Sequence, residues 1–302
     1  MHETLSFWPP RETIKRLACV TMVRDEEFFL ELMLNHYCRM TDEVDFFIID
    51  HASKVPVSEF ISTRIRNIHP GRINVIRIPP IPFDDDYKSS ALSSLANMVV
   101  AAYNVVLVSD VDEIIVPIGG DLVDIAMRDA REVIAPLGFE VIHHREREAV
   151  YRMDRHLLDQ RRYGYFRAAE SKPVIWKAPN TAGPGLHKSI KPFGFNEMLI
   201  LAHLRYVDYD MSRQRITHRQ SVEFSSSQKD HGYGAYWGAS IEAREAIFEK
   251  ILSSDLLEAG PVMEDFLHRL QASISLQQGG FHGPDLSVSS AFCTLDGVFQ
   301  SG

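Results

Sequence analysis

The chain has 302 residues, of which 45% are hydrophobic, and a formal net charge of −9. This length and composition allow one large α/β domain with a substantial core. The acidic balance excludes a general nucleic-acid binder, because affinity for a phosphate backbone needs clustered Lys and Arg. The three cysteines, Cys19, Cys38 and Cys293, lack metal-ligand spacing, so neither a disulfide scaffold nor a zinc site is expected.

The sequence shows no secretory leader and no apolar run of about 18 residues that could cross a bilayer. We therefore expect a cytoplasmic protein, either free of membranes or in peripheral contact with one. Specific small-molecule chemistry in a reducing compartment is the function class that this composition favours.

The first half of the chain alternates strand and helix signals. Strands are predicted at residues 16–23, 44–50, 73–78 and 105–108, and helices at residues 25–38, 57–66 and 87–101. Such a βαβ series forms an open sheet of parallel strands covered by helices, and ligands bind at the carboxyl ends of these strands. One rim of the sheet is expected to carry the polar residues that follow the strands, which are Arg24, Asp50, His51, Ser53 and Asp110. No glycine-rich dinucleotide or P-loop sequence occurs, which argues against those two classes.

Residues 105–116, VLVSDVDEIIVP, predict a buried strand that ends in three acids. Asp110 and Asp112 are two residues apart, so both side chains point to the same side of an extended segment. Hard oxygen ligands in this arrangement suit Mg²⁺ or Mn²⁺, which keep open positions for the phosphate oxygens of a substrate. The sequence shows no obvious basic neighbour for these acids, so we expect a bound cation to offset their repulsion. A solvated turn that caps the next helix is the alternative.

Three segments together resemble the GT-A fold glycosyltransferases, close to family 2. TMVRDEEFFLELMLNHY (residues 21–37) resembles the opening of that family, FFIIDHAS (residues 46–53) its second strand, and VLVSDVDEIIVP its DxD strand. The resemblance covers roughly residues 17–118. Two departures occur, because Asp25 stands where the family usually has Asn, and residues 50–54 differ from its usual polar stretch.

The resemblance implies a nucleotide-sugar site on the predicted rim. Arg24 and Asp50, with Ser53 nearby, would contact the base and ribose. Asp110 and Asp112 would hold Mn²⁺ or Mg²⁺ on the diphosphate, where a divalent ion stabilises the charge that builds on the leaving group.

Enzymes of this type often use a histidine from a later part of the chain to complete the metal shell or to contact phosphate. His187 and His203 are the two candidates here, with Lys188 or Arg205 neutralising the diphosphate. A satisfied core histidine is the alternative for His203, because it lies in an apolar run.

The alternation of strands and helices breaks down after residue 120. Residues 137–143 predict one more strand, and the segment that follows mixes His, Arg and acids with aromatic residues. This segment suits an acceptor-side loop, and its arginines favour an acidic or phosphorylated acceptor, since Arg forks bind anions. Family 2 enzymes mostly invert, and inversion needs a base for the proton of the acceptor hydroxyl. Among several later acids, Glu146 and Asp154 are the predicted bases.

The last part of the chain is predicted to be a helical and irregular extension. Residues 224–238 suit a loop that closes over a sugar, because flat apolar rings stack on pyranose faces. Residues 239–252 and 262–270 suit amphipathic helices that pack on the domain or pair with a second copy of the chain in a homo-oligomer.

These expectations define an α/β protein with a GT-A type open, mixed and mostly parallel sheet flanked by helices. The GT-A domain would span residues 1–220, with a nucleotide-sugar half at about 17–118 and an acceptor half at about 119–220. Residues 221–302 would form the extension.

The predicted function is metal-dependent, inverting transfer of a sugar from a nucleotide diphosphate sugar to a hydroxyl of a glycan, a lipid-linked molecule or a small molecule, as in polysaccharide biosynthesis. A nucleotidyltransferase is one alternative, although it would usually place a glycine-rich basic loop after its first strand, where this chain has TMVRDEE. A non-catalytic nucleotide-sugar or glycan binding protein is the other. The presence of both Asp110 and Asp112 argues against it.

Overall fold

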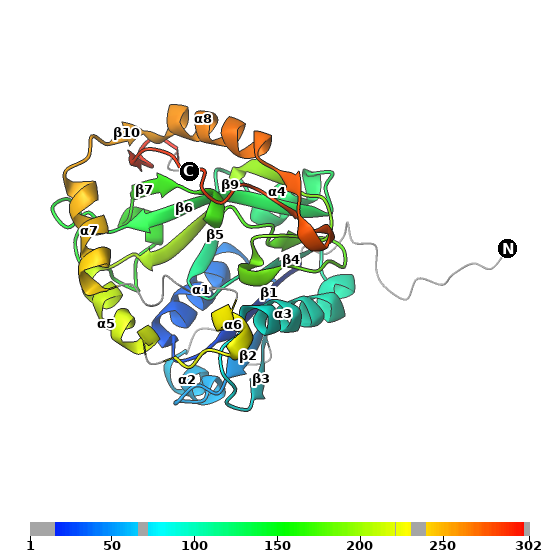
Figure 1. Cartoon of the computed structure of the whole chain (residues 1–302). Coiled ribbons are helices and arrows are strands. Elements are labelled where there is room, and N and C mark those ends of the chain that lie inside the picture. The colour runs from blue at the N-terminus through cyan, green and yellow to red at the C-terminus, as the bar shows by residue number, and fades with distance from the viewer. Residues whose placement is uncertain (1–15, 66–71, 221, 231–239, 299–302) are drawn as a thin grey trace.

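The computed structural model describes residues 16–65, 72–220, 222–230 and 240–298. In this part of the chain a mixed 11-stranded sheet forms the centre of the molecule, and helices lie around it (Figure 1). The predicted α/β class, with a mixed sheet flanked by helices, is confirmed.

Four parallel strands form the first half of the sheet, which are β1 (Leu17–Val23), β2 (Val44–His51), β3 (Ile73–Ile78) and β4 (Val105–Val108). They alternate with α1 (Glu27–Met40), α2 (Val57–Arg64) and α3 (Asp85–Val99), and the short 3-10 helix η2 (Val100–Ala102) follows α3. The apolar run of β4 is buried at every position, as expected for a central parallel strand. This half of the fold therefore matches the predicted series.

Two helices begin at residues that differ from the prediction. α1 begins at Glu27 instead of Asp25, because Asp25 adopts a left-handed backbone with φ 52°. α3 begins at Asp85 instead of Tyr87, because the side chain of Asp84 accepts a hydrogen bond from the backbone N–H of Tyr87 and caps the helix. Both corrections reflect the chemistry of the turn that precedes the helix.

The second half of the sheet contains both parallel and antiparallel strand pairs. Its strands are β5 (Glu113–Pro117), β6 (Val133–Ile142), β7 (Tyr163–Phe166), β8 (Ile175–Trp176) and β9 (Gly194–Tyr206), together with α4 (Leu122–Arg128) and the 3-10 helices η3 (Leu157–Asp159), η4 (Ala168–Glu170) and η5 (Pro184–Leu186). β9 runs antiparallel to β5 and parallel to β6. The strand predicted at residues 137–143 is the later part of β6.

The C-terminal segment joins the same sheet. It contains α5 (Tyr209–Gln220), α6 (Ser226–Asp230), α7 (Ile241–Leu252), β10 (Leu257–Glu258), α8 (Ala259–Ala272), β11 (Ser275–Leu276), η7 (Gln278–Gly280), β12 (His282–Gly283) and β13 (Cys293–Thr294). The strand order is β10-β13-β7-β6-β8-β4-β1-β2-β3, while β11 and β12 form a separate pair. Phe266, Leu270 and Leu295 share one core with Leu17 of β1. The division at residue 220 stays a prediction.

The predicted C-terminal helices correspond to α7 and α8. Most of the predicted loop at residues 224–238 lies outside the described residues. α5 and α7 contact each other at one end of the sheet (Figure 1). Among the described residues, no helix combines the length and the apolar character needed to cross a bilayer.

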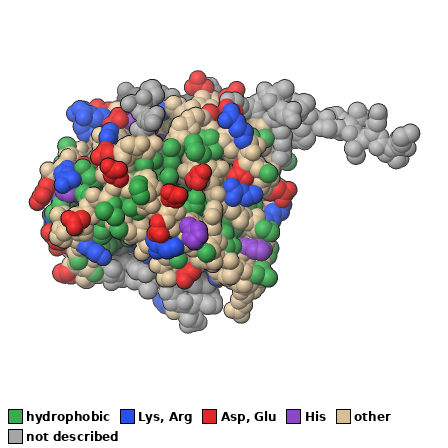
Figure 2. All heavy atoms as spheres, turned by 90° about the horizontal axis from the view of Figure 1, so that it is seen from above, with side chains coloured by type: hydrophobic (Ala, Val, Ile, Leu, Met, Phe, Trp, Pro, Cys, Tyr) green, Lys and Arg blue, Asp and Glu red, His purple; other side chains and the backbone are tan. Residues whose placement is uncertain are grey.

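The surface carries charges of both signs. On the face seen in Figure 2, acidic and basic side chains of the described residues lie among exposed apolar side chains, without a large area of one sign.

Candidate functional site

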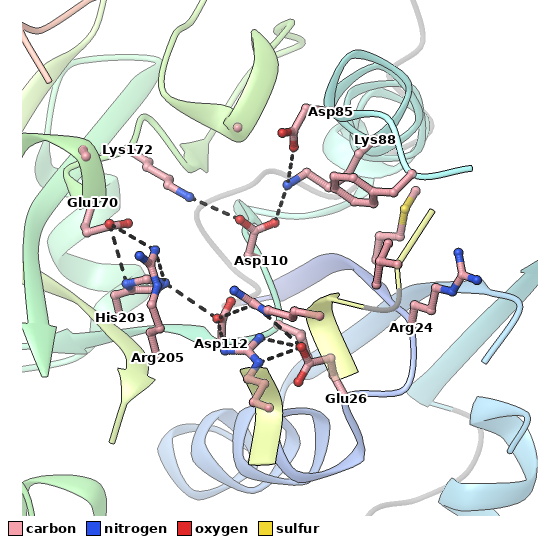
Figure 3. A pocket seen from close by; sticks show the side chains of 18 of the residues that line it. Arg24, Glu26, Asp85, Lys88, Asp110, Asp112, Glu170, Lys172, His203 and Arg205 are labelled. Carbon is pink, nitrogen blue, oxygen red and sulfur yellow. Dashed lines mark hydrogen bonds and ion pairs between the residues drawn. The ribbon is translucent and has the colours of Figure 1, made fainter. Parts of the chain in front are cut away.

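A cavity of about 460 Å³ opens at the carboxyl ends of β1 and β4 (Figure 3). Its volume lies in the usual range for small-ligand sites. The wall combines segments that are far apart in the sequence: the turns after β1 and β4, the start of α3, the end of η4, the end of β9, and helices α5 and α7. The cavity therefore lies where ligands bind in open α/β sheets.

The wall carries more positive than negative side chains. Seven Lys and Arg side chains line it, which are Arg24, Lys88, Arg167, Lys172, Arg205, Arg215 and Arg219. Five acids line it as well, which are Glu26, Asp85, Asp110, Asp112 and Glu170. The cavity is cationic although the whole chain has a formal net charge of −9. Its charge suits an anionic ligand.

Asp110 follows β4 and lies between two ammonium groups. Its Oδ1 accepts a hydrogen bond from Lys88 Nζ at 3.0 Å, and its Oδ2 accepts one from Lys172 Nζ at 3.2 Å. Burial raises the pKa of the Asp110 carboxyl, but the two lysines outweigh burial and hold that pKa well below its usual value. The carboxylate is therefore ionised at neutral pH.

Asp112 is more deeply buried, with 4% of the residue exposed. Its Oδ2 lies 2.6 Å from Arg215 Nη1, 3.4 Å from Arg219 Nη2 and 3.6 Å from His203 Nε2. Both arginines come from α5 and also lie near Glu26 Oε1, at 2.7 and 3.6 Å. Burial raises the pKa of Asp112, but Arg215 and the other cations outweigh burial and hold it well below its usual value.

The expectation that these acids lack basic neighbours is wrong. Lys88, Lys172, Arg215 and Arg219 neutralise them, and between 22 and 107 residues of sequence separate each cation from its acid. The sequence around the acids could not show these partners, because the fold alone brings them together. Charge balance by itself therefore no longer requires a bound metal.

The cavity wall nevertheless contains residue types that suit a divalent ion, although the ligand atoms of Asp110, Asp112 and His187 do not all lie within 4.8 Å of one another. Asp110 and Asp112 supply carboxylate oxygens, and His187 lines the same cavity. Burial, with Lys172 as the second cause, lowers the pKa of His187 to about 3, so its imidazole is neutral and keeps a lone pair. The buried Nδ1 of His187 has no hydrogen-bond partner among the described residues. These residue types fit Mn²⁺ or Mg²⁺.

His203 differs from His187 because it is protonated. Its Nδ1 lies 2.9 Å from Glu140 Oε1 and 3.6 Å from Glu170 Oε1. Burial lowers the pKa of His203, but Glu140 and Glu170 outweigh burial and raise it to about 10. An imidazolium has no free lone pair. In this arrangement His203 therefore bridges acids and is not a ready metal ligand.

A second group of atoms of the types that bind metals includes His203 and Glu170. One atom each from Glu113, Glu170 and His203 lies within 4.8 Å of the others. Lys172 Nζ lies 2.5 Å from Glu113 Oε1, so an ammonium group already occupies a place among these acids. Burial raises the pKa of Glu113 to about 7 although Lys172 lowers it. This group is an ion-pair network in the present structure.

The structure brings five of the predicted site residues to the cavity wall, which are Arg24, Asp110, Asp112, His187 and His203. Arg205, the alternative to Lys188 for neutralising the diphosphate, lines the cavity too. Lys188 itself does not line the cavity. The remaining predicted residues, Asp50, Ser53, Glu146 and Asp154, are also absent from the wall.

Asp50 and Ser53 support the rim of the sheet. The carboxylate of Asp50 is 1% exposed and accepts hydrogen bonds from the backbone N–H groups of Ser53 and Val57 and from Arg77 Nη1. Ser53 Oγ accepts a hydrogen bond from the backbone N–H of Asp25 at 3.2 Å. These bonds connect the turn after β2 with the turn after β1. The predicted contact of Asp50 with a ribose therefore receives no support from its position.

Glu146 and Asp154 are exposed on the segment between β6 and β7. Asp154 pairs with Arg152 at 2.7 Å. A base must lie within hydrogen-bond reach of the hydroxyl that it deprotonates. Because neither residue lines the cavity, their positions do not support the predicted role as bases for a hydroxyl bound there.

Sequence reasoning missed several residues that line the cavity, namely Lys88, Glu170, Lys172, Arg215 and Arg219. Arg215 and Arg219 are four residues apart and therefore share one face of α5, a spacing that a search for paired basic residues after β9 would have found. Lys88, Glu170 and Lys172 carry no comparable local signal, because their roles depend on which segments meet in the fold.

Comparison with protein-family models gives no match, and neither does comparison with curated proteins. Among solved structures, the chain is similar to S. aureus TarS 1-349 in complexes with UDP and with UDP-GlcNAc, at 10% identity over 76% of this chain and 77% of that chain, with a TM-score of 0.39. It is also similar to the mannosyltransferase PcManGT from Pyrobaculum calidifontis in complex with GDP-Man and Mn²⁺, at 13% identity over 47% of this chain and 39% of that chain, with a TM-score of 0.27. Similarity at this level assigns neither a family nor a ligand to this chain.

Proposed function

We propose that this chain is a glycosyltransferase that takes its sugar from a nucleoside diphosphate sugar. The observation that carries the proposal is the cationic cavity at the carboxyl ends of β1 and β4, with Asp110 and Asp112 in its wall. Departure of a nucleoside diphosphate builds negative charge on phosphate oxygens, and preorganised lysines and arginines stabilise such charge. This edge of an open α/β sheet is also where nucleotides bind.

We infer that a divalent ion, Mn²⁺ or Mg²⁺, takes part in the same site. Asp110, Asp112 and the neutral His187 would hold it, and His203 would join them only after losing a proton. When bound there, the ion would offset the charge of the leaving diphosphate. Arg24, at the end of β1, would contact the nucleoside.

The acceptor would bind at the end of the cavity opposite to Arg24, where Glu170 lies (Figure 3). Burial raises the pKa of Glu170, but His203 and Arg205 outweigh burial and lower it to about 2. Glu170 is therefore ionised at neutral pH, which is the protonation state of a base, although the same cations lower its affinity for a proton. We propose Glu170, in place of Glu146 and Asp154, as the base of an inverting transfer to a glycan, lipid-linked or small-molecule acceptor.

A second candidate is a protein that binds a nucleotide sugar without transferring it. The ion pairs on Asp110 and Asp112 favour this candidate, because they neutralise both acids without a metal. The two candidates differ in turnover. The transferase releases a nucleoside diphosphate from its donor, whereas the binding protein retains the intact donor.

Thermal unfolding against a panel of nucleoside diphosphates and nucleotide sugars, with and without Mn²⁺, tests the proposal. A ligand that binds only the native state raises the midpoint, so one nucleoside diphosphate should raise it, and more so with Mn²⁺. Release of that diphosphate from the matching nucleotide sugar would then support transfer over binding alone. Absence of a shift with every nucleotide would refute the proposed donor site.

A further inference from the structure

The two lysines that neutralise Asp110 are each held by a second acid. Lys88 Nζ lies 3.1 Å from Asp85 Oδ1, and Lys172 Nζ lies 2.5 Å from Glu113 Oε1. These second acids belong to the start of α3 and the start of β5. Because they remain in place, the lysines can release Asp110 without leaving the cavity.

The same arrangement occurs at Asp112. Arg215 lies 2.6 Å from Asp112 and 2.7 Å from Glu26, and Arg219 lies 3.4 Å from Asp112 and 3.6 Å from Glu26. Asp112 and Glu26 face each other across these guanidinium groups (Figure 3). Glu26 can therefore hold both arginines at the cavity wall when they separate from Asp112.

A divalent ion that arrives alone meets acids whose charge is already neutralised. If it bound Asp110 and Asp112, the two lysines and two arginines would each lose a partner in a largely buried site, which is unfavourable. A diphosphate that arrives alone meets cations that are shared with acids, and the acids repel its oxygens. When both arrive, the acids face the ion and the cations face the phosphates, so every charge keeps an opposite partner.

The proposed function already has the divalent ion and the nucleoside diphosphate bind together in this cavity. We propose that they bind as a coupled pair through an exchange of partners, in which the four cations leave the two acids for phosphate oxygens. This inference rests on the proposed function, since it takes a nucleoside diphosphate as the ligand. It gives Arg215 and Arg219 a role in the donor site. By reciprocity, each ligand tightens the binding of the other by the same factor.

Titration of Mn²⁺ into the purified protein tests the coupling, with free Mn²⁺ measured from its electron paramagnetic resonance signal. UDP, GDP, ADP, CDP and dTDP serve as probes, each corrected for the Mn²⁺ that it binds in buffer. The affinity for Mn²⁺ should rise about tenfold or more in the presence of the nucleotide that binds. Equal Mn²⁺ affinity with and without that nucleotide would overturn the coupling alone. Failure of every nucleotide to bind would overturn the proposed function as well.

Arg219→Gln distinguishes partner exchange from a merely structural role. Without this charge Asp112 has one competitor fewer, so Mn²⁺ alone should bind more tightly, by about fivefold. The nucleotide in saturating Mn²⁺ should bind more weakly, by about tenfold, because a phosphate partner is lost. A general loss of structure would weaken both ligands, so changes of the same sign would overturn the exchange. Arg219→Lys keeps the charge, so its affinities for Mn²⁺ and for the nucleotide should lie between those of the wild-type protein and of Arg219→Gln.

Arg213→Gln is the matched control on the same helix. Arg213 pairs with Glu245 at 3.2 Å, and 49% of its side chain is exposed. Arg213 does not line the cavity, so the variant should bind Mn²⁺ and the nucleotide with the same affinities as the wild-type protein. If Arg219→Gln does not fold, Lys88→Gln tests the Asp110 side of the cavity and should give the same pair of opposite changes. The absence of opposite changes in the folded variant would reject the exchange.

Discussion

The two halves of the chain contribute different charges to the cavity. Residues 17–118 supply the parallel strands and both acids of the DxD segment, whereas five of the seven Lys and Arg side chains of the wall come from residues 167–219. Strand continuity places the acids, and the packing of η4, β9 and α5 on the rim places most of the cations. Charge balance in this cavity is therefore a property of the assembled fold and of neither half alone.

Removal of Asp112 tests this comparison most strongly, because this acid of the first half holds arginines of the second. In Asp112→Ala, Arg215 and Arg219 keep Glu26 but lose the other of their two acidic partners in a buried site. We expect the free energy of unfolding, measured by urea denaturation, to fall by about 3–5 kcal/mol. Metal-dependent nucleotide binding should be lost as well.

Asp296→Ala is the control for Asp112→Ala, because it removes an ion pair to Arg162 in which both side chains are 50% exposed. Its unfolding free energy should change by less than about 0.5 kcal/mol. An Asp112→Ala protein as stable as this control would show that the two halves are not coupled through Asp112.

Glu170→Gln tests whether the second half also supplies the chemistry. Glutamine keeps the size of the side chain but cannot accept the proton, so turnover should fall by about 100-fold or more. Nucleotide binding in Mn²⁺ should persist, since Glu170 lies at the end of the cavity opposite to Arg24. Release of nucleoside diphosphate measures the turnover. Glu132→Gln, at an exposed acid that pairs with Lys191, is the control, and equal turnover in the two variants would reject Glu170 as the base.

Asp50→Ala tests whether the first half needs this acid for structure or for ligand. Three hydrogen-bond donors lose a buried acceptor in the variant, so the free energy of unfolding should fall by about 2 kcal/mol. The thermal shift produced by the nucleotide should remain. Arg24→Gln should behave in the opposite way, with a smaller nucleotide shift at nearly unchanged stability. Loss of nucleotide binding in a stable Asp50→Ala protein would instead support the predicted contact between Asp50 and the ribose.

The same contrast shows what the sequence could predict. Apolar runs and helical spacing are local signals, so β1, α1, β2 and β4 are recognisable from residues 17–118. The position of Asp50 at a strand end is local too, but the direction of its side chain is not. Ala52 adopts a left-handed backbone with φ 55°, and the resulting turn brings the N–H of Ser53 to the Asp50 carboxylate. The pairing of Asp110 with Lys172 depends on tertiary contact, for which the sequence has no local pattern.

His203 connects acids of the second half with Asp112 through a charge that depends on pH. Folding raises its pKa to about 10, because Glu140 and Glu170 outweigh burial, whereas the unfolded chain has a value of about 6.5. The stability that this raised pKa adds is present below about pH 6.5 and is lost as pH rises through about 10. The free energy of unfolding should fall by more than about 1 kcal/mol over this window.

Urea denaturation at several pH values measures this loss, and His203→Gln should remove it because glutamine does not titrate. His268→Gln, at an exposed histidine of α8, is the control and should keep the wild-type pH dependence. Equal pH dependence in all three proteins would show that His203 does not carry the charge that bridges these acids.

The smallest effect is expected at Glu146 and Asp154, which are exposed parts of the second half outside the cavity. Exposed ion pairs such as Asp154 with Arg152 contribute little to stability, so Glu146→Gln and Asp154→Asn should change the unfolding free energy by less than about 0.5 kcal/mol. Turnover should fall by far less than the roughly 100-fold loss that removal of a base causes. A loss of that size in either variant would show that the acceptor binds at the outer segment between β6 and β7 and not in the cavity, because a base must reach the hydroxyl that it deprotonates. The second half would then bind the acceptor apart from the cations that it contributes to the cavity.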